Sequence, residues 1–388
     1  MNMVGEIVKL TEVKLKEISK NNRGYYGIGA SAVDYDENKY TYLRITDIND
    51  DGTINTTALM SVDDKNACDF LLKENDIVFA RTGASTGRNY FYDGEINNMV
   101  YAGFLIKFSL DKDKVNPRFI KYYCLSQNYK NWIASSLTGS TRPNINEKQL
   151  SEMPIILPYR EYQNRAVKVL DAITKKIQLN NQINDNLYEL GDNLYKEYFG
   201  NEKEELHTVK LSEVACNYDY KRKPMSSRER ESHKGKYPYY GATSIIDYVD
   251  DYIFDDIYIL MGEDGTVKTN DGKPVLQYIW GKNWINNHAH VLQGTKISTE
   301  HLLFALRSVN VESLVTGAVQ LKINQENMNK IEFKIGNEKI NNEFNSLIQA
   351  IMNKIRKIKE ENETLAQLRD TLLPKLINGE IDLENIEI

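Results

Sequence analysis

An eight-residue segment of this chain combines two arginines with small residues in a way that suits contact with phosphates or bases. It reads Arg81-Thr82-Gly83-Ala84-Ser85-Thr86-Gly87-Arg88. Small residues let a loop approach phosphate groups closely, and arginine can donate two hydrogen bonds to guanine. An ordinary glycine-rich hairpin loop with solvated arginines fits the same residues equally well. The predicted DNA contacts are Arg81, Thr82, Ser85, Thr86 and Arg88.

A second candidate segment is strongly basic. Residues 221–236 include seven Lys or Arg and only two acids, Glu229 and Glu231, although the whole chain has a net charge of −6. Clustered cations can neutralise phosphates, but two solvated surface loops would carry the same charges, and both interpretations stay open. The candidate phosphate contacts are Lys221, Arg222 and Lys223, and the candidates for contacts with bases or backbone are Tyr240, Lys268 and His288.

Motifs of several catalytic classes are absent from the sequence. A DNA adenine methyltransferase needs a cofactor loop and an Asn-Pro-Pro-Tyr-like tetrapeptide for the flipped base. Gly27-Ile28-Gly29 is a lone glycine pair, and Asn116-Pro117-Arg118-Phe119 lacks the second proline. None of the eight prolines precedes an acid, which argues against a Pro-Asp nuclease. His288 and His290 would share a strand face, but no third metal ligand is near them in the sequence. We expect neither a catalytic site nor a metal site.

The residues around the first candidate segment read as one mixed α and β unit, 1–158. Short runs rich in Val, Ile and Tyr, such as 40–45 and 76–80, alternate with Gly and Asp turns, as strands do. Asn116 before Pro117 predicts the start of a helix. An apolar stripe on that helix would contain Phe119, Tyr122, Tyr123 and Tyr129.

Two segments, 159–200 and 336–388, have apolar residues spaced by threes and fours. This spacing predicts long coiled-coil helices, and because each needs a partner, we expect them to pack antiparallel. Asn184 and Asn362 occupy matching positions, where a buried pair could fix the register and a water-exposed gap is equally plausible. The predicted seam residues are Ile173, Ile177, Asn184, Leu187 and Leu194 in the first helix and Ile351, Ile355, Asn362, Leu365 and Leu372 in the second.

The second half of the chain repeats the first. Thr138-Gly139 returns 178 positions later as Thr316-Gly317, and the offset holds as far as Leu372. Residues 8–13 return as 209–214, and 262–265 stands where 81–83 stood. We therefore predict an α+β protein with a pseudo-twofold internal repeat. Its two similar mixed α/β domains, 1–158 and 201–335, would be separated by two long antiparallel coiled-coil helices, 159–200 and 336–388 with its tail.

Composition narrows the cellular setting. No apolar run approaches the ~18 residues that a membrane span needs, and residues 1–10 lack the apolar core of a signal peptide. Three widely spaced cysteines form neither a disulfide framework nor a zinc motif. We expect a cytoplasmic protein with no membrane contact.

Four stretches together carry a family resemblance. They are Thr138-Gly139-Ser140-Thr141-Arg142-Pro143 with 155–158, the segment 176–187, the pair 237–242 and 286–290, and the segment 368–381. In combination they resemble the specificity subunit of Type I restriction-modification systems. The resemblance implies two target-recognition domains that each read one half of a split double-stranded DNA site, held apart by long helices that also dock two methyltransferase subunits. It adds Ser140, Thr141 and Arg142 to the DNA-contact candidates, but the second repeat has Ala318-Val319-Gln320-Leu321 there, so Arg142 has no copy.

The resemblance thus implies a DNA reader that is not itself an enzyme and that assembles with modification and restriction subunits. S-adenosylmethionine and ATP would be bound by those partners, with no cofactor in this chain. One rival is a coiled-coil scaffold whose globular ends bind only proteins. DNA affinity that falls steeply with salt would exclude it. A second rival is a self-contained methyltransferase, which cofactor binding by the isolated chain would support.

Overall fold

A computed structural model describes residues 8–137, 143–200, 204–317 and 320–383. The contacts divide the chain into two compact units, one of residues 1–178 with 363–388 and the other of residues 179–362. The first unit is therefore built from both ends of the chain, whereas the second is one continuous segment. Each unit contains one mixed α/β region and a part of both long helices.

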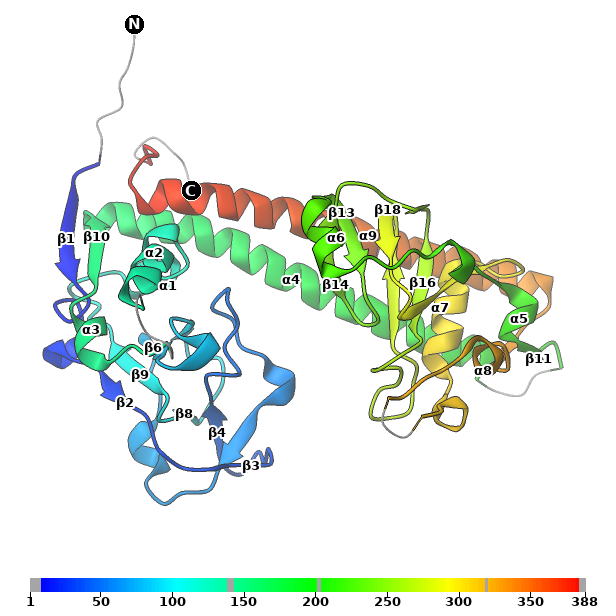
Figure 1. Cartoon of the computed structure of the whole chain (residues 1–388), viewed down its shortest axis with the longest axis horizontal. Helices are drawn as coiled ribbons and strands as arrows, with labels where there is room; N and C mark the ends of the chain where they lie inside the picture. The colour runs from blue at the N-terminus through cyan, green and yellow to red at the C-terminus, as the bar shows by residue number, and fades with distance from the viewer. Residues whose placement is uncertain (1–7, 138–142, 201–203, 318–319, 384–388) are drawn as a thin grey trace, which may run out of the picture. The chain divides into compact units, whose positions relative to one another are not determined.

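Three small sheets make up the β structure of the first unit over its described residues (Figure 1). Their strand orders are β1-β10, β2-β9-β6-β7 and β3-β5-β4-β8. The strands predicted at 40–45 and 76–80 are confirmed as β4 and β6. The bounds are β1 Leu10–Lys14, β2 Tyr25–Tyr26, β3 Ala32–Val33, β4 Tyr40–Leu43, β5 Met60–Val62, β6 Asp76–Ala80, β7 Asn89–Tyr92, β8 Met99–Tyr101, β9 Leu105–Ser109 and β10 Pro154–Pro158.

The first helix of this unit begins at the predicted cap. The side chain of Asn116 accepts a hydrogen bond from the N–H of Arg118 at 3.0 Å, and Pro117 is the first helical residue. The predicted apolar stripe is wrong in one respect, because Ser126 caps a new helix and Tyr129 belongs to it. The bounds are α1 Pro117–Tyr123, α2 Gln127–Ser136, α3 Glu147–Ser151 and α4 Arg160–Phe199.

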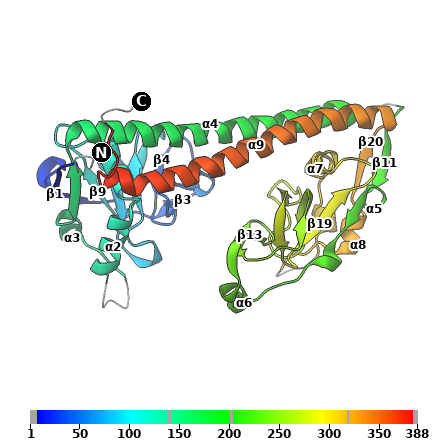
Figure 2. The same cartoon turned by 90° about the horizontal axis from the view of Figure 1, so that it is seen from above.

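Two of the three sheets of the second unit repeat the strand order of the first unit, and the third shares the parallel strand pair but has its fourth strand at the opposite edge. Figure 2 shows both units from another side. The orders in the second unit are β11-β20, β12-β19-β16-β17 and β14-β13-β18-β15, and β13 runs parallel to β18 as β4 does to β8. This confirms two similar domains. The strand bounds are β11 His207–Lys210, β12 Ala215–Asn217, β13 Lys234–Tyr240, β14 Ile245–Val249, β15 Phe254–Asp255, β16 Tyr258–Gly262, β17 Leu276–Ile279, β18 Lys282–Ile285, β19 Ala289–Gly294 and β20 Glu332–Ile335. The helix bounds are α5 Leu211–Val214, α6 Ser227–Ser232, α7 Thr299–Ser308, α8 Gln325–Asn329 and α9 Glu338–Ile377.

The sequence prediction placed the repeated opening segment at the wrong residues of the first half. Val13 pairs with Ile155 in the first unit, and Val209 pairs with Phe333, which is 178 positions after Ile155. Residues 13–18 are therefore the counterpart of 209–214, and the prediction that 8–13 fills this role is wrong. The error arose because Val-Lys-Leu occurs at both 8–10 and 13–15. Burial agrees with the new register, since Leu15 and Leu211 are both fully buried.

The long helices pack antiparallel within the second unit. Asn180 of α4 donates to Asn362 of α9 at 2.8 Å, and the Tyr195 ring lies 5.9 Å from that of Phe344. None of the ten predicted seam residues is exposed. The predicted asparagine pair does not form, because Asn362 contacts Asn180 and Asn181 instead of Asn184.

Asn184 has neither of the predicted environments. Its side chain is 4% exposed, and neither amide atom has a hydrogen-bond partner in the described part of the chain. The repeat explains the difference. Asn180 pairs with Asn362, the repeat copy of Asn184, so the equivalent position for Asn184 is the copy of Asn180. That copy is the buried Ile358, which has no polar group to offer.

We expect Asn184→Leu to stabilise the second unit. A buried amide without partners costs about 1–3 kcal/mol, and leucine has the same branched shape without polar atoms, so the gain, less the cost of fitting its larger side chain, should be about 1–2 kcal/mol in urea denaturation. Asn180→Leu, one helical turn earlier, is the matched control. It removes hydrogen bonds to Glu361 and Asn362 and should not stabilise. A loss of stability in Asn184→Leu would contradict the argument.

Candidate nucleic-acid interface

The glycine-rich segment of the first unit is fixed by hydrogen bonds to two other backbone segments. Arg81 follows β6, and its N–H donates to the carbonyl of Phe104, in the turn before β9, at 3.0 Å. The N–H of Ile145 donates to the carbonyl of Arg81 at 2.9 Å, and the N–H of Gly83 to that of Pro143 at 3.1 Å. Gly83 has a φ of 71°, in the left-handed region that favours glycine. We call these three hydrogen-bonded segments the backbone frame: the segment from Arg81 to Gly83 directly after β6, the turn at Phe104, and residues 143–145.

The two arginines of this segment have different environments. The Arg81 guanidinium lies 5.0 Å from the centroid of the Tyr26 ring, its buried Nε has no hydrogen-bond partner, and it has no acidic partner within the described residues. Arg88 instead donates from Nε to Asp50 at 2.7 Å and from a terminal nitrogen to the carbonyl of Ile48 at 3.1 Å. Arg81 can therefore bind an acceptor without losing an ion pair, whereas Arg88 cannot.

The hydroxyl residues of the segment have local roles. Thr86 donates from its hydroxyl to the carbonyl of Gly83 at 2.7 Å, which closes the turn. Thr82 pairs with Asn144 through a backbone bridge, and Ser85 ends the short helical turn Gly83–Ser85. Thr82 and Ser85 are half-buried beside Arg81. Three other predicted contacts, Ser140, Thr141 and Arg142, lie outside the described residues.

The second unit contains the same backbone frame. The N–H of Glu263 donates to the carbonyl of His288 at 2.9 Å, and the N–H of Ile323 donates to the carbonyl of Glu263 at 3.0 Å. The N–H of Gly265 donates to the carbonyl of Leu321 at 2.9 Å, and Gly265 has a φ of 83°. The prediction that 262–265 stands where 81–83 stands is confirmed.

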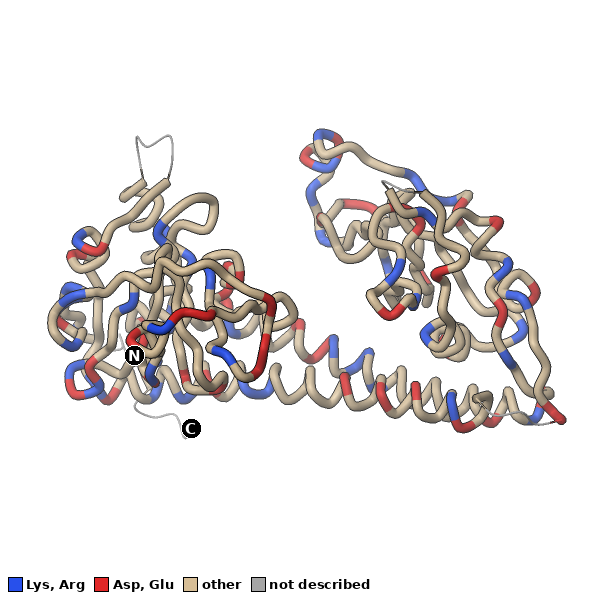
Figure 3. The backbone as a smooth tube through the Cα atoms, turned by 90° about the horizontal axis from the view of Figure 1, so that it is seen from below, with Lys and Arg blue, Asp and Glu red and all other residues tan. Residues whose placement is uncertain are grey.

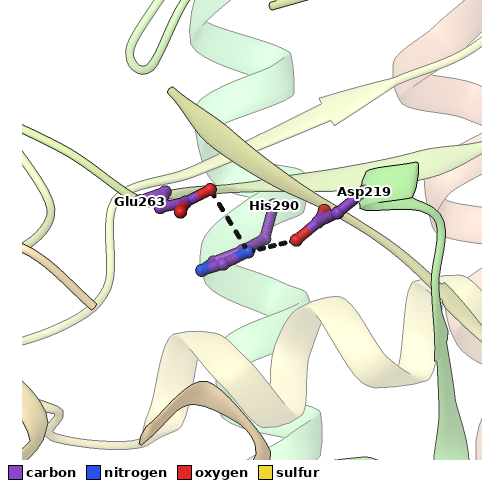
Figure 4. A group of neighbouring side chains, drawn as sticks. All are labelled: Asp219, Glu263 and His290. Atoms are coloured by element: carbon purple, nitrogen blue, oxygen red, sulfur yellow. Dashed lines mark hydrogen bonds and ion pairs between the residues drawn. The ribbon is translucent and has the colours of Figure 1, made fainter. Parts of the chain in front are cut away.

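An ion network lies beside this second frame. His290 of β19 is 1% exposed, and its Nδ1 lies 2.6 Å from Asp219 Oδ2 and 3.7 Å from Glu263 Oε2 (Figure 4). Its Nε2 lies 2.8 Å from the carbonyl oxygen of Ile323. Arg222, with a side chain only 12% exposed, lies 3.3 Å from Asp219 and 2.7 Å from Glu263. Buried charges of both signs are therefore paired with one another.

One imidazole and two carboxylates are a donor set that could hold a divalent cation. No sequence motif indicates this donor set, because Asp219 and Glu263 are far from His290 along the chain. Both ring nitrogens of His290 already face oxygen atoms, however, and Arg222 neutralises the carboxylates. Burial opposes the charged form of Asp219, but hydrogen bonds, chiefly with His290, bring its pKa below the usual value. We interpret the cluster as a structural ion network.

A family model for the Type I restriction modification DNA specificity domain matches residues 7–189 and 203–367. The chain belongs to this family. The two matched segments correspond to the two copies of the repeated fold, so the backbone frame is a feature of both specificity domains.

Individual relatives agree with this assignment. A proposed type I restriction enzyme specificity subunit of Haemophilus influenzae is 31% identical over 151 residues, which are 39% of this chain and 38% of that protein. The match therefore spans well under half of the relative. The type I restriction enzyme MjaIX specificity subunit of Methanocaldococcus jannaschii is 22% identical over 313 residues, 71% of this chain and 72% of that protein. The crystal structure of a Type I restriction-modification S subunit from M. genitalium has a TM-score of 0.59 at 17% identity, covers 97% of this chain and 98% of its own, and shares the fold.

In the second specificity domain, two of the predicted contacts lie near the frame. His288 has a half-exposed side chain whose Nδ1 is 3.6 Å from Asp264. Tyr240 ends β13, and its carbonyl accepts from the N–H of Asn286 at 3.1 Å, in the turn that contains His288. Lys268 instead forms an ion pair with Glu312 at 2.7 Å.

The three predicted phosphate contacts of this specificity domain separate into two kinds. Arg222 points inward to the ion network, because Asp219 and Glu263 hold it there, and this argues against the phosphate contact expected of it. Lys221 is exposed, with Nζ 4.8 Å from the Tyr218 ring, and Lys223 is exposed as well. Along the backbone of each domain, positions of Lys and Arg are interspersed with positions of Asp and Glu (Figure 3).

Two residues of the backbone frames, Phe104 and Lys322, were not predicted from the sequence. Phe104 is 59% exposed. The Lys322 side chain is 43% exposed and lies 3.2 Å from Glu263 and 3.3 Å from Asp264. The repeat offset could have identified Lys322, since it is the copy of Asn144. Nothing in the sequence distinguishes Phe104 from the core aromatics around it.

Among the helices of the described residues, none is both long and apolar enough to cross a membrane.

Proposed function

We propose that this chain is the sequence-specific DNA-recognition subunit of a Type I restriction-modification complex. Each specificity domain would read one half of a bipartite double-stranded site. The observation that carries this proposal is the backbone frame, which recurs in both domains with the same hydrogen bonds and different side chains. A shared scaffold with different side chains is what reading two different half-sites requires.

The rest of the complex belongs to the same proposal. Two methyltransferase subunits and the restriction subunits would carry the chemistry, with S-adenosylmethionine and ATP bound by them in the cytoplasm. This chain would contribute recognition and assembly without catalysis. Membership of the DNA specificity family supports the recognition role.

The test compares the DNA methylation of host cells that carry the complete system with that of cells lacking only this chain. We expect a two-part methylated motif that disappears on deletion. Purified complex should bind DNA that carries this motif, with an affinity that falls steeply as salt rises, because phosphate contacts release counterions. Methylation that is unaltered by the deletion, or binding to proteins without any to DNA, would overturn the proposal and favour a protein scaffold.

An apolar stripe on α4 is the surface that we assign to a methyltransferase subunit. Leu179, Ile183 and Leu190 are 45%, 43% and 46% exposed, and their spacing of four and seven places them on one helix face. Isolated exposed leucines are ordinary, but three on one face favour a partner. A methyltransferase subunit that covers them would gain about 1.5 kcal/mol or more from each side chain.

We expect replacement of all three stripe residues by glutamate to weaken methyltransferase binding roughly a thousandfold. Thermal unfolding of the chain should hardly change, because the side chains are exposed. Leu347→Glu is the control, since Leu347 is 44% exposed on α9 without such neighbours. Co-purification and titration calorimetry with the methyltransferase subunit measure the effect. Undiminished binding would show that the stripe is not the docking surface.

A further inference from the structure

The two backbone frames are equivalent residue by residue. Arg81 and Glu263 both follow the last residue of a central strand. The backbone N–H of each donates to the carbonyl of a turn residue, Phe104 or His288, and the carbonyl of each accepts from the N–H of an isoleucine. Phe104 and His288 each directly precede the next strand, β9 or β19. Asn144 and Lys322 each precede the isoleucine of the third segment and lie 178 positions apart.

The exposed side chains on these equivalent positions differ in chemistry. The first frame presents an apolar ring, Phe104, beside the guanidinium of Arg81, which has no acidic partner in the described regions. The second presents an imidazole and an ammonium group, His288 and Lys322, above carboxylates that are themselves ion-paired. The backbone is constant, and the surface chemistry changes from one domain to the other.

We propose that the frame positions determine the base specificity of the two domains, an inference that rests on the proposed function. Arg81 would donate to the O6 and N7 acceptors of a guanine, and Phe104 would contact a thymine methyl group. His288 and Lys322 would donate to purine acceptors in the other half-site. The turn and the strand end are rigid elements, which suits side chains that must discriminate between bases.

Two structural features separate these residues from ordinary surface groups. Arg81 is positioned by a ring contact and by three segments of backbone, yet no carboxylate in the described parts of the unit binds it. Lys322 and His288 are oriented by Asp264, at 3.3 Å and 3.6 Å, while 43% and 50% of their side chains stay exposed. In both frames, donors are held in place. Lys322 and His288 are about half-exposed, whereas Arg81 is half-buried with its Nε enclosed.

The experiment maps the methylated motif in cells that carry the complete system with single substitutions in this chain. Arg81→Ala and Phe104→Ala should each relax one base position of one half-site, by about tenfold to a hundredfold in discrimination, and leave the other half unchanged. His288→Ala and Lys322→Ala should do the same only in the other half-site. Arg81→Lys keeps the charge but lacks the two-pronged donor, so it should relax the same position as Arg81→Ala.

Matched controls are available in both domains. Tyr35 is 58% exposed, almost as much as Phe104, and Lys296 is an exposed lysine outside the second frame. Tyr35→Ala and Lys296→Ala should leave the motif intact. A normal two-part motif in every frame variant, or an equal relaxation of both halves, would overturn the inference while leaving the proposed function standing. The absence of any motif with the unmodified chain would instead overturn the proposed function.

Discussion

Arg222→Ala should destabilise the second unit by about 3–5 kcal/mol. The side chain is 12% exposed, and its removal leaves Asp219 and Glu263 buried without their shared cation, together with the carbonyl of Ala289, to which Arg222 donates at 2.7 Å. Breaking one side of a buried ion network has this cost because the two carboxylates lose the arginine and keep only His290 and, for Glu263, the partly exposed Lys322. Urea denaturation followed by the fluorescence of Trp280 and Trp284, both in this unit, measures the effect.

The neighbouring residue supplies the control. Lys223 is exposed, so Lys223→Ala should change stability by less than about 0.5 kcal/mol. If both substitutions had the same small effect, Arg222 would not be part of a structural network, and the phosphate contact predicted from the sequence would return to consideration.

Acid should weaken the same network. The folded pKa of Asp219 is below its usual value of 3.8, so its stabilising contribution is present above that value and is lost as the pH falls through the lower folded pKa. Asp219→Asn should therefore lower stability at neutral pH and flatten the acid limb of the stability curve below about pH 4. An acid limb that is identical in the two proteins would show that other carboxylates produce it.

Phe344→Ala should have an effect of similar size through loss of packing. Phe344 is fully buried, and its ring centroid lies 5.1 Å from that of Phe199 and 4.7 Å from the imidazole of His301. Truncating a buried phenylalanine typically costs about 3–5 kcal/mol. Leu347→Ala, on the exposed side of the same helix, should cost far less, and thermal unfolding of the two variants makes the comparison. Equal losses would indicate that this aromatic contact contributes little to stability.

Strands and helices could be predicted because the sequence patterns that indicate them are local or occur in both halves of the chain. The β6 strand lies at the predicted residues, Asn116 caps its helix, and the 178-residue offset aligns Ile145 with Ile323 in equivalent hydrogen bonds. The prediction of the opening repeat was wrong because two nearby copies of Val-Lys-Leu give the same sequence signal, and only strand pairing decides between them.

The candidate site was less accessible to sequence reasoning, because charge pairing depends on distant residues. Arg222 belongs to a basic run, yet Glu263, 41 positions away, holds it inside the domain. Arg81 and Arg88 have the same local context, and only the three-dimensional position of Asp50 separates them. The predicted pairing of Asn184 with Asn362 was wrong for a related reason. Residues that match in the repeat do not face each other in this antiparallel helix pair.

The division of the first unit between the two ends of the chain determines when that unit can be completed during synthesis. Its core includes Leu373, Leu376, Ile377 and Leu383, which are among the last described residues, whereas the second unit needs only residues 179–362. A ribosome releases the chain from its N-terminus onward. The second unit can therefore close its core first, and the core of the first unit is completed only after residues 363–383 have followed the whole of the second unit out of the ribosome. The unit that begins to emerge first is the one that is completed last, so its apolar core residues are exposed to chaperones and proteases for longer than those of the second unit.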